Sequence, residues 1–96
     1  MNTATISVMI VDDEPAIRNG MKNALNWQEL GLVLTNLYSN GQEAFEAIKR
    51  NTPSIVITDL KMPKMTGLEL IRKAKDEGIN SHFIILSGYD DFKFAK

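Results

Sequence analysis

The stretch IVITDLKMP, residues 55–63, decides the fold of this chain. Residues 55–57 are three consecutive β-branched apolar residues, and Thr58 and the carboxylate of Asp59 follow them. An uninterrupted apolar run bounded by turn residues is typical of a strand that is buried on both faces, as in a parallel sheet. Open α/β sheets carry their sites at the carboxyl ends of the strands, so Asp59 is the first candidate functional residue.

Three further stretches predict strands. Residues 8–11 form a second all-apolar run, which ends at a pair of aspartates. Residues 32–38 are mixed in polarity, which favours a strand near an edge of the sheet. Residues 83–86 are apolar again and predict a strand that ends at Ser87.

Amphipathic helices are predicted between these strands. The first helix begins at Pro15, a residue tolerated at the first helical position, and ends near Asn26. The second begins after Asn40 and the third after Thr66, each with a glutamate three residues later, as in a capping box. A fourth helix is predicted to begin near residue 90. The side chains expected to be buried are Ile17, Met21, Ala24 and Leu25 in the first helix, Ala44, Phe45 and Ile48 in the second, and Leu68, Ile71 and Ala74 in the third.

This alternation of strands and helices predicts a parallel sheet with right-handed crossovers and helices on both faces. We therefore expect one domain over residues 1–96, an α/β doubly wound fold. The flavodoxin-like strand order 2-1-3-4 would set the first and third strands side by side.

The composition argues against nucleic-acid binding, membrane association and cysteine chemistry. A net charge of −1 gives no basic field that would attract nucleic acid or an anionic membrane. No apolar run approaches the ~20 residues needed to span a bilayer. The chain has no cysteine, which excludes disulfide and thiol chemistry and fits a cytoplasmic protein.

Three carboxylates are expected to meet in one crevice: Asp12, Asp13 and Asp59. Two unit charges ~4 Å apart repel by about 4 kcal/mol at an effective dielectric near 20, so such a group favours a bound cation. Oxygen ligands without histidine or cysteine favour Mg²⁺. An aspartate can also act as a nucleophile toward phosphorus, and Ser87 is placed to donate its hydroxyl to a phosphoryl oxygen.

Each of these signals has a simpler reading when taken alone. The acidic residues before Pro15 could serve only as favourable charges at a helix N-terminus. Thr58-Asp59 and Ser87-Gly88 could be ordinary turns. The functional interpretation depends on complementary groups at three successive strand ends.

Together the motifs resemble the receiver domain of two-component response regulators. The residues that carry the resemblance are VDDE at 11–14, TDLKMP at 58–63 followed by Gly67, and LSGY at 86–89. The resemblance implies that Asp59 accepts phosphate from a phosphohistidine on a sensor histidine kinase. It also implies that Mg²⁺ is bound by Asp13, Asp59 and the main-chain carbonyl of Lys61, that Asp12 acts through water, and that Ser87 is the switch hydroxyl.

Three more stretches, residues 26–31, 40–41 and 87–92, resemble receivers joined to an AraC-type helix-turn-helix effector. This implies that the parent protein is a cytoplasmic transcription regulator whose DNA contacts belong to that effector. We expect no direct contact of residues 1–96 with nucleic acid or membrane.

The C-terminus departs from the family pattern. Receivers continue through a fourth helix, a fifth strand that carries a lysine, and a fifth helix, whereas this sequence stops at Lys96. Neither Lys93 nor Lys96 matches that lysine. The fourth strand would then be an open edge, which predicts self-association, strand exchange between copies, or a marginally stable fold.

Two alternatives to a receiver stay open from the sequence. One is a Mg²⁺-dependent phosphatase with an aspartyl nucleophile, although such enzymes place a second aspartate where this chain has Lys61. The other is an interaction module with a vestigial site. A receiver would catalyse its own phosphorylation and dephosphorylation rather than turn over a substrate.

Overall fold

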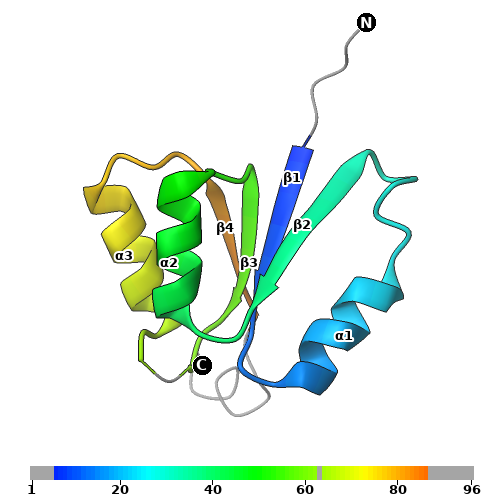
Figure 1. Cartoon of the computed structure of the whole chain (residues 1–96), viewed down its shortest axis with the longest axis horizontal. Coiled ribbons are helices and arrows are strands. Elements are labelled where there is room, and N and C mark those ends of the chain that lie inside the picture. Colours follow the sequence, from blue (N-terminus) through cyan, green and yellow to red (C-terminus); the bar gives the residue numbers. More distant parts are fainter. Residues whose placement is uncertain (1–5, 63, 87–96) are drawn as a thin grey trace, which may run out of the picture.

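The computed structural model describes residues 6–62 and 64–86, and their strands and helices alternate along the chain (Figure 1). The strands form one parallel sheet in the order β2-β1-β3-β4, which confirms the predicted flavodoxin-like arrangement. The elements are β1 (Ile6–Val11), α1 (Pro15–Ala24), β2 (Leu32–Tyr38), α2 (Gly41–Arg50), β3 (Ile55–Asp59), α3 (Gly67–Asp76) and β4 (His82–Leu86).

The strand register places the predicted site residues at one edge of the sheet. Val11 pairs with Thr58 between β1 and β3, so Asp12 and Asp59 each come one position later on neighbouring strands. Asp59 in turn pairs with Leu86 of β4. As predicted, β2 lies at an edge of the sheet, and β1 and β3 are its central strands.

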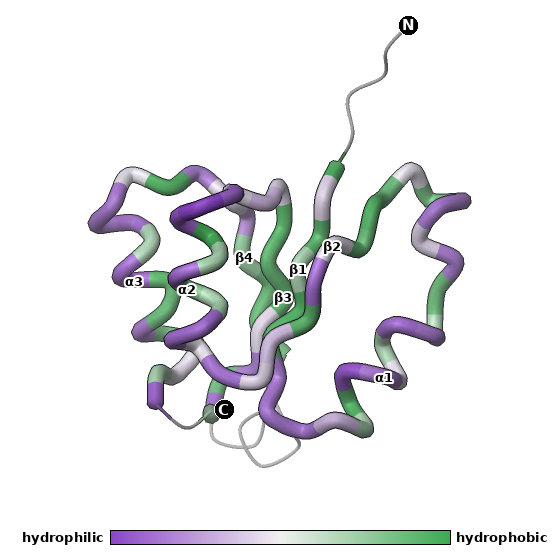
Figure 2. Tube along the Cα trace, viewed as in Figure 1, coloured by the Kyte–Doolittle hydropathy of each residue, from purple (hydrophilic) through white to green (hydrophobic). Residues whose placement is uncertain are grey.

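Helices α2 and α3 lie together on one face of the sheet, where most of the core is found (Figure 1). The predicted face of α2 is confirmed, because Ala44, Phe45 and Ile48 are all buried. Figure 2 shows that hydrophobic residues dominate the strands and alternate with hydrophilic ones along α2 and α3. The buried cluster on this face consists of Met9, Val11, Ala44, Phe45, Ala47, Ile48, Val56, Met62, Met65 and Leu70.

The apolar face predicted for α3 was wrong at Leu68 and only partly met at Ile71, which is half-buried, while Ala74 is buried as predicted. Leu68 is 56% exposed, whereas Leu70 is fully buried together with Ala74. Helix α3 begins at Gly67, and buried positions recur from there at Leu70 and Ala74, a spacing of one helix face. Sequence periodicity alone did not fix which of the two leucines, Leu68 or Leu70, enters the buried cluster.

Helix α1 lies on the other face of the sheet, away from α2 and α3 (Figure 1), and its side chains stay largely exposed to solvent. The prediction of its buried face was wrong, since α1 contains no buried residue and Ile17 is 40% exposed. Met21 and Trp27 are only partly buried, against a small cluster formed by Val8, Ile10 and Ile57. The apolar spacing predicted the helix correctly, but it could not show how much of that helix another element would cover.

The helix ends follow local chemistry. The Asn40 side chain accepts a hydrogen bond from the Glu43 backbone N–H at 2.9 Å, which confirms the cap predicted for α2. Thr66 and Glu69 form a reciprocal capping box at the start of α3. Gly78 follows α3 with a positive φ of 78°, the conformation that favours glycine after a helix.

Candidate functional site

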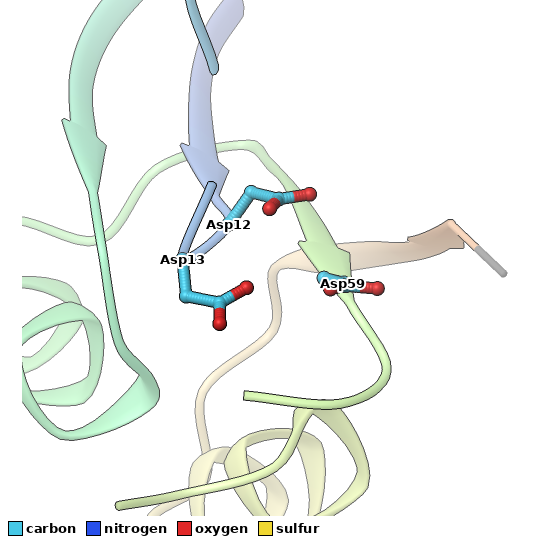
Figure 3. Close-up of side chains that lie close together, drawn as sticks. All are labelled: Asp12, Asp13 and Asp59. Carbon is cyan, nitrogen blue, oxygen red and sulfur yellow. The ribbon is translucent and has the colours of Figure 1, made fainter. Parts of the chain in front are cut away.

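The carboxylates of Asp12, Asp13 and Asp59 converge at the carboxyl end of the sheet (Figure 3). One oxygen from each lies within 4.8 Å of the others. Asp12 and Asp13 follow β1, and Asp59 ends β3, so the adjacency of β1 and β3 brings them together. The sequence predicted this convergence, and the structure confirms it.

Asp12 is the buried member of the group, with 4% of its surface exposed. Its backbone N–H donates to the Tyr38 carbonyl at 3.0 Å, which extends the β1–β2 ladder by one bond. Its Oδ1 accepts from the Glu14 N–H at 2.9 Å, and its carbonyl accepts from Arg18 Nη1 at 2.6 Å. These contacts fix the backbone that carries Asp12 and Asp13 at the start of α1.

Asp59 is held by the loop that follows it, of which residues 60–62 and 64–66 are described and are here called the β3–α3 loop. The Leu60 N–H donates to Asp59 Oδ1 at 2.8 Å, and the Leu60 carbonyl accepts from the Gly67 N–H at 2.9 Å. A Cβ on Gly67 would lie only 2.3 Å from the Asp59 carbonyl oxygen. The loop therefore folds back so closely on Asp59 that only glycine fits at residue 67.

Two methionines of the same loop pack into the core. Met62 and Met65 are 7% and 3% exposed, within the cluster beneath α2 and α3. Their burial fixes the loop to the well-packed face of the sheet, because exposing either side chain would return apolar surface to water.

Burial raises the pKa of the Asp59 carboxyl above its ordinary value of 3.8, and the negative charge of Asp12 raises it further. The Leu60 N–H opposes this by stabilising the ionised form; Asp13 adds a smaller upward push, and the Lys61 N–H a smaller downward one. The ionised form of Asp59 is thus disfavoured where it lies, and a cation bound beside it would relieve this cost.

The donor set fits a hard divalent cation. All three side chains offer carboxylate oxygen, the ligand type that Mg²⁺ prefers. The chain's single histidine, His82, begins β4 and so lies at the opposite end of that strand from Leu86, the partner of Asp59. Softer metals that require nitrogen or sulfur ligands are disfavoured by this set.

The remaining predicted site residues have different outcomes. Ser87 lies outside the described residues, as does the helix predicted to begin near residue 90, so neither prediction is tested. Lys61 is described and its side chain is exposed. The role predicted for its carbonyl as a metal ligand stays a prediction.

The sequence interpretation gave no role to Arg18 or to the two buried methionines. Arg18 contacts the Asp12 carbonyl from the first turn of α1, and no motif in the sequence marked this contact between residues six positions apart. Apolar residues inside a loop were the only signal for Met62 and Met65. Gly67 was part of the motif, but its close approach to Asp59 was not foreseen.

Comparison with known families matches residues 8–96 to the response regulator receiver domain. Among curated relatives, the transcriptional regulatory protein YesN of Bacillus subtilis is 45% identical over 89 residues, which cover 93% of this chain and 24% of that protein. The transcriptional regulatory protein HptR of Staphylococcus aureus is 36% identical over 93% of this chain and 34% of its own length. The chain thus spans about a quarter to a third of these relatives.

Solved structures give the same result. The receiver domain of AraT, a response regulator from Geobacillus stearothermophilus, matches with a TM-score of 0.87 at 35% identity, over 96% of this chain and 71% of that one. A two-component transcriptional regulator AraC from Clostridium phytofermentans matches with a TM-score of 0.79 at 31% identity, over 94% of this chain and 73% of that one.

No helix within residues 6–62 and 64–86 is long and apolar enough to cross a membrane.

Proposed function

This chain belongs to the response regulator receiver domain family, and from that premise we propose that Asp59 is its phosphoryl acceptor. The donor would be a phosphohistidine on a sensor histidine kinase. The observation that carries the proposal is the convergence of the Asp12, Asp13 and Asp59 carboxylates within 4.8 Å at the carboxyl end of a parallel sheet.

The transfer is a single displacement at phosphorus. An Asp59 carboxylate oxygen forms a bond to phosphorus while the bond from phosphorus to the histidine nitrogen breaks. The nitrogen keeps that electron pair, takes up a proton, and leaves as neutral imidazole. The product is an acyl phosphate on Asp59, and the Leu60 N–H that donates to Oδ1 at 2.8 Å orients the attacking group.

A divalent ion, for which we propose Mg²⁺, would be held by Asp13, Asp59 and the Lys61 carbonyl, with Asp12 acting through water. When bound, it neutralises charge that builds up on the phosphoryl oxygens during transfer. The protein's own part is positioning: Asp12 is buried and fixed by three hydrogen bonds, and the β3–α3 loop is fixed by its methionines. Ser87 is proposed as the hydroxyl that reports the phosphoryl group to the rest of the domain.

The proposal also covers the parent protein to which this receiver belongs and the contacts between copies of the chain. The relatives are transcriptional regulatory proteins several times longer than the match, which supports a parent protein with a DNA-binding effector, proposed to be AraC-type. We further propose that residues 1–96 form one receiver unit in the cytoplasm. Within the described residues β4 is an edge strand, so pairing or strand exchange between copies through β4 is proposed as well.

The test is phosphorylation by acetyl phosphate in the presence of Mg²⁺, followed by intact-mass measurement and peptide mapping. We expect one phosphoryl adduct per chain, located on Asp59 and absent in Asp59→Asn. Asp76→Asn, at an exposed position in α3, is the matched control and should label like the wild type. Labelling that survives in Asp59→Asn, or repeated turnover of a phosphomonoester, would contradict the proposal.

A further inference from the structure

Gly41, the first residue of α2, lies so close to the β3–α3 loop that a residue with a Cβ atom would not fit there. A Cβ built on it would lie 2.5 Å from the Met65 carbonyl oxygen and 2.8 Å from the Met65 Cβ. Real Cβ atoms essentially never approach so closely, and the first of these partners is backbone. Gly41 has no positive φ, so the reason for glycine here is space and not backbone conformation.

The turn that contains Gly41 also contacts the other half of the acidic site. The Tyr38 carbonyl, three residues earlier, accepts the hydrogen bond from the Asp12 N–H at 3.0 Å. Residues 38–41, here called the β2–α2 turn, therefore touch the backbone of Asp12 at one end and Met65 at the other. The turn contributes no carboxylate itself.

The β2–α2 turn is built to be rigid. Asn40 is 6% exposed, and its side chain caps α2 through the Glu43 N–H at 2.9 Å. Its carbonyl accepts from the Ala44 N–H at 3.2 Å, which closes the first turn of the helix. Met65, on the far side of the contact, is itself 3% exposed and packed in the core. Neither partner can move aside without breaking buried contacts.

We propose that Gly41 is a positioning residue for the acidic site: it lets the β2–α2 turn set the separation between the Asp12–Asp13 backbone and the β3–α3 loop that follows Asp59. A side chain at residue 41 would push the loop away from the turn. Asp59 would then move relative to Asp12 and Asp13. This inference rests on the proposed function, because it concerns how the same carboxylates share one ion.

The first experiment measures the Mg²⁺ dissociation constant by calorimetry in Gly41→Ala, at a temperature where each variant is folded by circular dichroism. Residues that orient metal ligands typically change affinity by about 10–100-fold when altered, and we expect a weakening in that range. Two controls separate positioning from simple destabilisation. Gly20→Ala adds a Cβ to α1 with nothing within 4 Å, and Ile48→Val weakens the core within α2 itself. Both should bind Mg²⁺ within twofold of the wild type.

The second experiment uses the wild-type protein, so it does not depend on the variant folding. We expect Mg²⁺ to slow amide hydrogen exchange at Glu43 and Ala44, whose N–H groups bond to Asn40, while exchange at Asn51 at the far end of α2 stays unchanged. Wild-type affinity in a folded Gly41→Ala, or unchanged exchange at Glu43 and Ala44, would overturn the inference. A wild type that binds no Mg²⁺ at all would instead refute the proposed function on which it rests.

Discussion

The two faces of the sheet differ sharply in how they are covered. Under α2 and α3, ten of the described residues form a buried cluster that includes both loop methionines, whereas α1 on the other face has no buried residue. The acidic site lies between these regions. Asp59 comes before α3, on the well-packed face, and Asp12 and Asp13 come before α1, on the poorly covered face. We infer that the two faces differ in rigidity: α1 is more easily displaced than α2 and α3, whereas Asp12, at the junction, is itself buried and fixed by its hydrogen bonds.

The largest expected difference between the two faces is in the loss of stability when one isoleucine on each face is truncated to alanine. Ile48→Ala, at a fully buried position in α2, should lower the free energy of unfolding by about 2–5 kcal/mol, since it removes buried methylene groups and leaves a cavity. Ile17→Ala, at a position 40% exposed in α1, should cost less than about 1 kcal/mol. Urea denaturation of both variants measures the difference. Equal losses would show that the two faces are equally packed.

The next effect concerns the loop on the well-packed face. Gly67→Ala places a Cβ 2.3 Å from the Asp59 carbonyl oxygen and should cost about 1–3 kcal/mol, the range for overpacking. Phosphorylation by acetyl phosphate should fall with it, because the clash displaces Asp59.

Gly20→Ala, in open space within α1, is the matched glycine on the poorly covered face and should stabilise the chain by about 0.5–1 kcal/mol. Denaturation midpoints and labelling rates for the two variants can be compared directly. A Gly67→Ala variant that labels like Gly20→Ala would contradict the role of the loop.

The strands were predictable because their signals are local, whereas the convergence of the acidic residues followed only once the flavodoxin-like strand order was assumed. Uninterrupted apolar runs at residues 8–11 and 55–57 mark the central strands, and a carboxylate follows each run within two residues. The approach of Gly41 to Met65 was not predictable, because it joins segments that are distant in the sequence and leaves no periodic pattern. The exposure of Ile17 and Leu68 was missed for a related reason: spacing identifies an apolar side chain but not the element that covers it.

A smaller difference is expected between the N-terminal caps of α3 and α1, in how much each contributes to stability. Thr66→Ala removes the side-chain cap of α3 and should cost about 1 kcal/mol. Glu14, at the same position before α1, makes no side-chain cap hydrogen bond. Glu14→Ser should therefore raise the free energy of unfolding by a few tenths of a kcal/mol up to about 1 kcal/mol. Thermal unfolding followed by circular dichroism measures both, and a destabilised Glu14→Ser would show that Glu14 has a contact of its own.

The smallest effect is the pH dependence of Asp59. Because its pKa in the folded chain is raised by burial and by Asp12, its ionised form is less stable in the folded than in the unfolded state. Its contribution to stability is thus complete below the ordinary value of 3.8 and is lost as pH rises through the folded pKa. Without Mg²⁺, Asp59→Asn should melt above the wild type at pH 7, with the difference vanishing at acidic pH. A lower melting temperature for Asp59→Asn at pH 7 would contradict this sign.

The most direct test of the account is a calorimetric Mg²⁺ titration of the wild type, Asp13→Asn, Asp59→Asn and the double variant. If both carboxylates serve one ion, the wild type binds one Mg²⁺ per chain, each single substitution removes most of the affinity, and the double variant is little worse than either. Wild-type affinity in either single variant, or losses that simply add in the double variant, would contradict a shared site.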